Sequence, residues 1–175
     1  MRIRTLTASD ASQYRELMLE AYTLAADAFT STPEERALEP QSWWINRVAN
    51  PEGLTVSFGA EVEHSLIGTV ALEYSSKTKT KHSALLIGIY VRAHARGQGV
   101  GRSLLQAALH HASQRPHTQT VTLTVTDGNE PAIRMYREAG FQAWGVEPLA
   151  IATPLGLLGK VHMSCKLAGH VPSAA

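Results

Sequence analysis

The sequence predicts one mixed α/β domain, with both α/β and α+β character, in which helices flank a β-sheet. Three observations indicate this class. Strand-like and helix-like patterns follow one another in the order β-α-α-β-β-β-α-β-α-β-β. A glycine-rich segment joins an apolar strand to a helix at the centre of this order. The chain has 175 residues, 44% of them hydrophobic, which is enough for one full core. We expect residues 2–167 to form the domain and residues 168–175 a loose tail.

The N-terminal part begins with a short strand and continues with helices. Residues 2–6, "RIRTL", alternate in polarity as a strand does. Thr7 and Asp10 resemble a capping box, so a helix is expected over residues 8–26. Its apolar face would consist of Tyr14, Leu17, Met18, Ala21 and Leu24. Prolines begin two further helical segments within residues 33–50.

Three strands are expected next. Residues 54–60 and 65–74 are β-rich and flank "EVEH", which predicts a hairpin. A polar, basic loop over 75–83 leads to "ALLIGIYV", residues 84–91. Because this segment is apolar throughout, it is predicted to be a strand buried on both faces.

The C-terminal half contains two helices and three strands. A helix is expected over 101–114, and "TVTLTVT" alternates as a strand over 120–126. The segment "NEPAIRMYREAG" predicts a helix with Asn129 as its N-cap, Pro131 in its first turn and Gly140 just after its end. The last two strands are expected over 141–151 and 159–167.

Composition excludes several classes of function. A formal net charge of +1 gives no general basis for binding nucleic acid or an anionic membrane. Cys165 is the one cysteine, so no intrachain disulfide forms, and we expect a buried structural thiol. The sequence shows no signal-peptide pattern and no apolar run of about 18 residues, which favours a cytoplasmic location. The histidines lack metal-ligand spacing, so no metal site is expected.

The glycine-rich segment predicts an anion site. Gly97, Gly99 and Gly101 have no Cβ, so an anion can approach the backbone amides at the start of a helix closely. Arg96, Arg102 and Ser103 add positive charge and a hydroxyl donor. A Walker loop would end in Gly-Lys-Ser/Thr, whereas this segment ends in "GRS". A dinucleotide loop would be Gly-x-Gly-x-x-Gly with an acidic residue about 20 positions later, and "TQTVTLT" has none.

Two motifs together resemble the GNAT superfamily of N-acetyltransferases. "RGQGVG" fits that family's acetyl-CoA loop, Arg/Gln-x-x-Gly-x-Gly/Ala. "NEPAIRMYREAGF" fits Asn-x-x-Ala-x-x-x-Tyr-x-x-x-Gly-Phe, matched by Asn129, Ala132, Tyr136, Gly140 and Phe141. The resemblance covers residues 2–167 and is weakest in 26–50 and 145–160, where the family varies its substrate pocket.

This resemblance implies a bent mixed sheet with two splayed parallel strands, here Leu85–Val91 and Val121–Thr126. The pantetheine arm of acetyl-CoA would enter the gap and bind backbone groups of the first strand. The amides of the glycine loop would bind the pyrophosphate, and the second motif would contact the cofactor from the far side. The implied cofactor-binding residues are Ile89, Tyr90, Val91, Arg96, Gly97, Gln98, Gly99, Val100, Gly101, Arg102, Ser103, Asn129, Ala132 and Tyr136.

The implied reaction is direct attack of a primary amine on the thioester in a ternary complex. In this family a tyrosine at the position of Tyr136 commonly protonates the leaving thiolate. The base is open, because the family shares no single base position. Candidates are Glu73 and His82, the glutamates of "PEE" (Glu34 and Glu35), or a water-mediated route with no dedicated base.

The acceptor pocket is expected between the first helices and the loop before the last strand. The predicted pocket residues are Phe29, Trp44 and Tyr90, with hydroxyls from Thr30 and Ser31. Trp43 and Trp44 are adjacent and so point about 100° apart on a helix, which places one in the core. "ATPLGLLG", residues 152–159, is neutral and mostly apolar, which favours a small apolar or zwitterionic amine over a polyamine or aminoglycoside.

Several alternatives remain open at this stage. The acceptor is the amine of a small molecule or a peptide. A GNAT fold that binds acyl-CoA without turnover, for regulation, is the second hypothesis, and transfer of a longer acyl group is the third. Many family members form homodimers through edge strands or the C-terminal hairpin, so a homodimer is considered by analogy alone.

Overall fold

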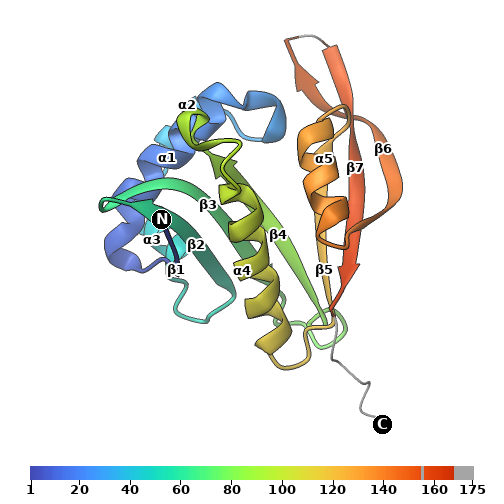
Figure 1. Ribbon diagram of the computed structural model, residues 1–175, viewed down its shortest axis with the longest axis horizontal. Coiled ribbons are helices and arrows are strands. Elements are labelled where there is room, and N and C mark those ends of the chain that lie inside the picture. The colour runs from blue at the N-terminus through green and yellow to red at the C-terminus, as the bar shows by residue number, and fades with distance from the viewer. Residues whose placement is uncertain (155, 168–175) are drawn as a thin grey trace.

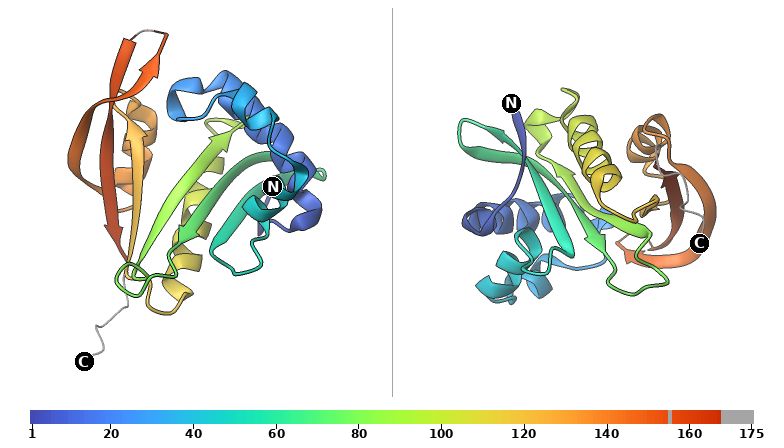
Figure 2. Two further views of the ribbon diagram at one scale, coloured as in Figure 1. Left: turned by 180° about the vertical axis from the view of Figure 1, so that it is seen from behind. Right: turned by 90° about the horizontal axis from the view of Figure 1, so that it is seen from below.

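The computed structural model describes residues 1–154 and 156–167. One seven-stranded sheet in the order β1-β2-β3-β4-β5-β7-β6 is covered by helices on both faces (Figures 1 and 2). The strands are β1 (Arg2–Thr5), β2 (Thr55–Val62), β3 (Ser65–Tyr74), β4 (Ser83–Val91), β5 (Thr120–Thr126), β6 (Gln142–Thr153) and β7 (Gly156–Lys166). The α-helices are α1 (Ala11–Leu24), α2 (Pro33–Ala37), α3 (Gln41–Val48), α4 (Val100–Gln114) and α5 (Glu130–Glu138). Three short 3₁₀ turns are η1 (Ala8–Asp10), η2 (Ala26–Ala28) and η3 (Ala93–Ala95).

The sheet splits at its centre, between β4 and β5. These parallel strands pair only at their beginnings, where Ser83, Ala84 and Leu85 face Thr120, Val121 and Thr122. Beyond this point they diverge, as Figure 1 shows, and β5 pairs along its whole length with β7 instead. The expected splay is confirmed, and it leaves the edge of β4 from Leu86 to Val91 without a neighbouring strand on that side.

A bulge bends β4 beside the gap. Ala71 of β3 pairs with Ile87 and Thr69 pairs with Tyr90, so β4 carries one extra residue here. Gly88 has φ +64°, which glycine adopts without steric cost. The prediction that β4 is buried on both faces is wrong: Leu85 is 39% exposed and Ile87 and Ile89 are half-buried. Leu85 still pairs with β5 but lines an open surface cavity with Glu73 and Thr122, and beyond it β5 turns away from Ile87 and Ile89.

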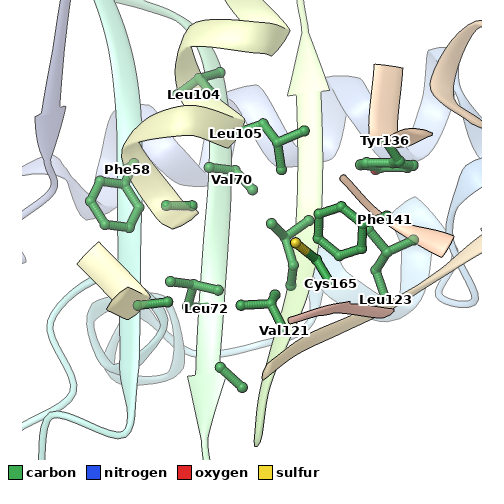
Figure 3. Packing of buried hydrophobic residues seen from close by; sticks show 14 of the residues in the cluster. Phe58, Val70, Leu72, Leu104, Leu105, Val121, Leu123, Tyr136, Phe141 and Cys165 are labelled. Carbon is green, nitrogen blue, oxygen red and sulfur yellow. The ribbon is translucent and has the colours of Figure 1, made fainter. Parts of the chain in front are cut away.

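Two hydrophobic clusters hold the helices on opposite faces of the sheet. The larger lies between the sheet and α4 and α5, and Figure 3 shows Phe58, Val70, Leu105 and Phe141 within it. Cys165 belongs to this cluster at 8% exposed, and burial raises the pKa of its thiol, as expected for a structural cysteine. The smaller cluster packs α1 and α3 on the other face.

The first helix differs from its prediction at both ends. Residues 8–10 form a 3₁₀ turn and the α-helix begins at Ala11, although the capping box of Thr7 and Asp10 is present. Tyr14, Leu17, Met18 and Ala21 are buried, whereas Leu24 is 65% exposed because the helix ends there.

The expected hairpin of β2 and β3 is present, and the last two strands, β6 and β7, also form a hairpin; in both pairs the strands are longer than predicted. The β2–β3 strands include residues of "EVEH", and the turn is made by Glu63 and His64 at positive φ. Residues 152–153 and 156–159, expected as a loop, continue β6 and β7 as a long hairpin arm. The tail expected over 168–175 lies outside the described residues.

A charge cluster joins β1 to the start of α1. Arg4 contacts Asp10 at 2.7 Å and Glu61 at 2.6 Å, and Asp10 also accepts a hydrogen bond from the Thr7 amide at 2.7 Å. The hydrogen bond from Arg4, reinforced by the Thr7 amide, lowers the pKa of Asp10 from 3.8 to about 2.

Asp10→Asn should therefore lower the free energy of unfolding at pH 7 by about 1–3 kcal/mol, since it weakens charge-assisted hydrogen bonds. A carboxylate whose pKa is depressed on folding stabilises the fold above its unfolded pKa, and this contribution is lost as pH falls towards about 2. Urea unfolding between pH 7 and pH 2 should show the difference between the two proteins narrowing below about pH 4. Glu16→Gln, at an exposed carboxylate, is the control. A difference that is constant with pH would contradict the assignment to the ionised carboxylate.

Candidate active site

The glycine loop connects the diverging end of β4 to the start of α4. After η3, Gly97 and Gly99 have φ +75° and +78°, and Gly99 is the N-cap of α4. The first helical hydrogen bond runs from the Ser103 amide to the Gly99 carbonyl at 3.0 Å. Amides of the first helical turn before Ser103 have no carbonyl partner within the helix. A Cβ at Gly97 or Gly99 would meet no atom within 4 Å, so the space outside these amides is open.

Two motif residues have contacts within the protein. The Arg96 Nε donates to the Val91 carbonyl at 2.9 Å, and its guanidinium lies 5.7 Å from the ring of Tyr90. A Cβ at Gly101 would lie 3.2 Å from the Met135 sulfur of α5. Arg96 therefore braces the loop against β4, and Gly101 lets α4 and α5 approach each other. The sequence motif alone does not separate these roles from direct anion contact.

α5 lies on the far side of the gap. The Asn129 side chain accepts a hydrogen bond from the Ala132 amide at 3.3 Å and caps this helix, as predicted. Arg102 of α4 forms an ion pair with Glu138 of α5. A surface cavity of about 360 Å³ opens here, lined by Arg102, Glu130, Pro131, Arg134, Met135 and Glu138. The two helix beginnings thus present basic side chains beside the open amides.

Tyr136 is packed where α5 meets the sheet. It is 4% exposed, and its ring lies 5.8 Å from Phe141 at an edge-to-face angle (Figure 3). Burial raises the pKa of its phenol, so the hydroxyl keeps its proton around neutral pH. Within the described part of the chain, this hydroxyl has no hydrogen-bond partner. It is a neutral donor with its donor capacity free.

The candidate bases are in very different places. Glu73 of β3 pairs with Leu85, the last residue of β4 that contacts β5, so it lies where the gap begins. Its carboxylate accepts a hydrogen bond from Arg47 Nη1 at 2.5 Å. His82 is exposed just before β4, at the closed end of the splay. Glu35 is occupied in the capping box of α2 with Thr32.

The predicted acceptor residues need correction. Trp44 is 0% exposed and packs on Tyr14, with ring centroids 6.1 Å apart, so it is a core residue. Tyr90 is 4% exposed, and its hydroxyl donates to Glu20 at 3.0 Å. Both side chains point into the cluster beneath α1, because that helix needs large apolar partners on the sheet. Neither is accessible to an acceptor.

The helical segment between α1 and α2 reaches the gap. The Thr126 hydroxyl of β5 donates to the Asp27 carbonyl of η2 at 2.5 Å, which connects the two halves of the sheet. Phe29 follows and packs edge-to-face on Tyr22, with ring centroids 5.0 Å apart. This segment borders the α1 side of the splay (Figure 2, left), and Phe29 within it is half-buried.

Sequence reasoning missed two arginines beside this segment. The guanidiniums of Arg36 and Arg47 lie 4.6 Å and 5.4 Å from the ring of Trp43. Arg47 is four positions after Trp43, a spacing that puts both on one helix face and could have indicated the contact. Arg36 comes from a separate helix, so no sequence spacing could have found it.

Comparison with known proteins identifies the family. A family model described as the acetyltransferase (GNAT) family matches residues 15–141. The chain belongs to the GNAT acetyltransferase family. The mycothiol acetyltransferase of Thermomonospora curvata is 30% identical over 135 residues, 73% of this chain and 41% of that protein. An uncharacterized N-acetyltransferase of Methanocaldococcus jannaschii is 28% identical over 142 residues, 80% of this chain and 60% of that protein. The chain thus covers less than two thirds of either relative.

Solved structures of the family share this fold. The Salmonella typhimurium protein yncA, in a structure with its cofactor acetyl-CoA, has a TM-score of 0.81 at 20% identity over 100% of this chain and 98% of that chain. The ribosomal-protein-alanine N-acetyltransferase of Brucella melitensis has a TM-score of 0.77 at 25% identity over 95% of this chain and 100% of that chain. The GNAT fold predicted from the two motifs is confirmed.

Two kinds of feature are absent from the residues that the structure describes. No helix within residues 1–154 and 156–167 is long and apolar enough to span a membrane. In the same residues no group of three His, Cys, Asp or Glu side chains is placed to hold a metal ion.

Proposed function

We propose that this protein is an N-acetyltransferase that moves the acetyl group of acetyl-CoA to a primary amine of a small molecule or peptide. The observation that carries the proposal is the pairing of open glycine-loop amides with a sheet that splits directly beside them. The glycine-loop amides are a site for a diphosphate, and the split sheet offers the unpaired edge of β4 to an amide-containing arm. Family membership supports the same activity.

The residues present fit acetyl-CoA. Gly97 and Gly99 leave a cradle that any Cβ would begin to fill, and the amides from Gly97 to Ser103 would bind the pyrophosphate. The free edge of Ile89–Val91 would bind the pantetheine amides, and α5 would contact the cofactor from Asn129 and Ala132. Acetyl-CoA supplies an acetyl thioester: a C–N bond to the amine forms, the C–S bond breaks, the amine loses a proton and the thiolate gains one.

The chain's own residues would manage these protons. Tyr136 holds its proton because burial disfavours the phenolate, so it is the donor for the departing sulfur. Glu73 lies at the start of the gap and would attract an ammonium and accept its proton, directly or through water. Its hydrogen bond from Arg47 fixes the position of the carboxylate, which suits a role in holding the ammonium.

The test is release of CoA thiol from acetyl-CoA across an acceptor panel of amino acids, polyamines, aminoglycosides and peptide N-termini. We expect release with one acceptor class and a mass increase of one acetyl group on that acceptor. Binding of acetyl-CoA without release on any acceptor would contradict the proposal and favour a non-catalytic acyl-CoA module. Faster release of CoA from propionyl- or succinyl-CoA than from acetyl-CoA would indicate that the protein transfers a longer acyl group instead of acetyl.

A further inference from the structure

Five side chains form a cluster on the α1–α3 face of the sheet, which we call the arginine cluster. They come from four elements: Tyr22 of α1, Arg36 of α2, Trp43 and Arg47 of α3, and Glu73 of β3. Trp43 is flanked by both guanidiniums. Burial raises the pKa of the Tyr22 phenol, and the positive charges of Arg36 and Arg47 oppose that rise.

The two arginines differ in how their charges are balanced. Arg47 has a carboxylate at 2.5 Å, that of Glu73, and both side chains are partly buried. Arg36 is only 27% exposed, and its nearest carboxylate is Glu39, at the longer distance of 3.5 Å. The Arg36 Nε is buried and has no hydrogen-bond partner within the structure described. A buried guanidinium N–H without an acceptor is costly, which indicates that a ligand oxygen satisfies it.

The arginine cluster adjoins the gap at two points. Glu73 pairs with Leu85, where β4 leaves β5. Tyr22 packs on Phe29, and the segment before Phe29 is bonded to β5 through Asp27 and Thr126. The arginine cluster therefore lies on the α1–α3 face of the sheet beside the start of the gap, whereas α4 and α5 pack on the opposite face.

From this arrangement we infer that the acceptor carries a carboxylate close to its reacting amine, as amino acids do. A simple cationic amine has no oxygen that could accept from the unpartnered Arg36 Nε, so it would leave this donor unsatisfied. In a zwitterionic acceptor, the carboxylate would accept hydrogen bonds from the free donors of Arg36, and the ammonium would donate to the carboxylate of Glu73. A planar guanidinium whose Cζ lies 4.6 Å from the ring centroid of Trp43 is well suited to bind a carboxylate through two parallel hydrogen bonds. The inference rests on the proposed function and narrows its acceptor.

The test compares matched acceptors with wild-type protein. Leucine, methionine and phenylalanine are each offered as the free amino acid, as the carboxamide and as the amine lacking the carboxylate. One carboxylate pairing corresponds to about 10- to 100-fold in kcat/KM. We expect the free acids to exceed both neutral forms by this factor. If amides or simple amines are acetylated as well as the acids, the inference is wrong while the proposed function stands. If acetyl-CoA binds and none of the nine compounds or the wider panel releases CoA, the proposed function itself fails.

The substitution Arg36→Gln tests the contribution of the Arg36 guanidinium to binding the acceptor's carboxylate. We expect it to raise the KM for the free acid about 10- to 100-fold and to change kcat/KM for the amide less than about threefold. Arg36→Lys keeps the positive charge but lacks the planar pair of N–H donors. It should therefore restore part of the activity with the free acid that Arg36→Gln loses. Arg15→Gln is the matched control, because Arg15 contacts the same helix only through the Ala37 carbonyl at 3.2 Å. A melting temperature and acetyl-CoA affinity unchanged in Arg36→Gln exclude misfolding. Equal losses with acid and amide would overturn the assignment.

Discussion

Tyr136→Phe should lower kcat about 10²- to 10³-fold while leaving acetyl-CoA affinity within a few-fold. General acid catalysis contributes about 10² to 10⁴ in rate, and this substitution removes only the hydroxyl. The ring packs on Phe141 and is buried, so phenylalanine fills the same space. Stopped-flow or steady-state CoA release with a saturating acceptor measures kcat, and calorimetric titration measures affinity. Because burial raises the phenol pKa, wild-type kcat should show no loss from this group up to about pH 10.

Tyr74→Phe is a matched control for that experiment. Tyr74 lies in the same hydrophobic cluster at 8% exposed, and burial raises the pKa of its phenol to about 12. Its hydroxyl is buried without a partner in the described chain, so losing it should leave stability equal or slightly higher. It packs on Arg115 and His111, away from the gap. If both substitutions lowered kcat equally, or if Tyr136→Phe left kcat unchanged, the acid role of Tyr136 would be refuted.

Gly99→Val should weaken acetyl-CoA binding by about 10- to 100-fold. Gly99 has φ +78° at the N-cap of α4, and its missing Cβ leaves open the space from which a phosphate reaches the amides. A branched side chain would occupy that space, and each lost charge-assisted hydrogen bond costs about 1.5–3 kcal/mol. Calorimetric titration with acetyl-CoA and with CoA should show the same loss, because both carry the pyrophosphate.

A valine at Gly99 would be strained by the left-handed backbone conformation, and this effect needs its own control. Gly53 has φ +65° and also has no atom within 4 Å of a Cβ, but it lies between α3 and β2. Gly53→Val should therefore lower the melting temperature about as much as Gly99→Val and leave acetyl-CoA affinity unchanged. If Gly99→Val bound acetyl-CoA as tightly as wild type, the pyrophosphate would lie elsewhere.

Much of the fold could be predicted from the sequence because the signals are local. Asn129 and Gly140 mark the two ends of α5 as expected, because capping and left-handed termination depend on a few adjacent residues. The hairpin of β2 and β3 follows from alternation interrupted by one turn. The two motifs also indicated the family, because a glycine loop and a tyrosine helix at that separation are rarely combined by chance.

The same local signals failed where burial depends on distant strands. The pattern predicts Leu85 as a core residue, yet it is 39% exposed because it lines an open surface cavity with Glu73 of β3 and Thr122 of β5. Trp43 and Trp44 are indistinguishable by type, and only the packing of α3 on α1 decides that Trp44 is the core residue. Gly101 fits the anion motif, but its lack of a side chain is required by Met135 across the gap.

The sequence by itself determined the class of the domain, its glycine loop and the tyrosine of α5, because each depends on contiguous residues with specific backbone or chemical requirements. Only the tertiary structure decided which side chains meet at the acceptor side. Arg36, Trp43, Arg47 and Glu73 come from three elements, and their approach depends on how α2 and α3 pack over the sheet. Contacts between residues far apart in the chain are set by the packing of whole helices and strands, and no spacing in the sequence encodes them.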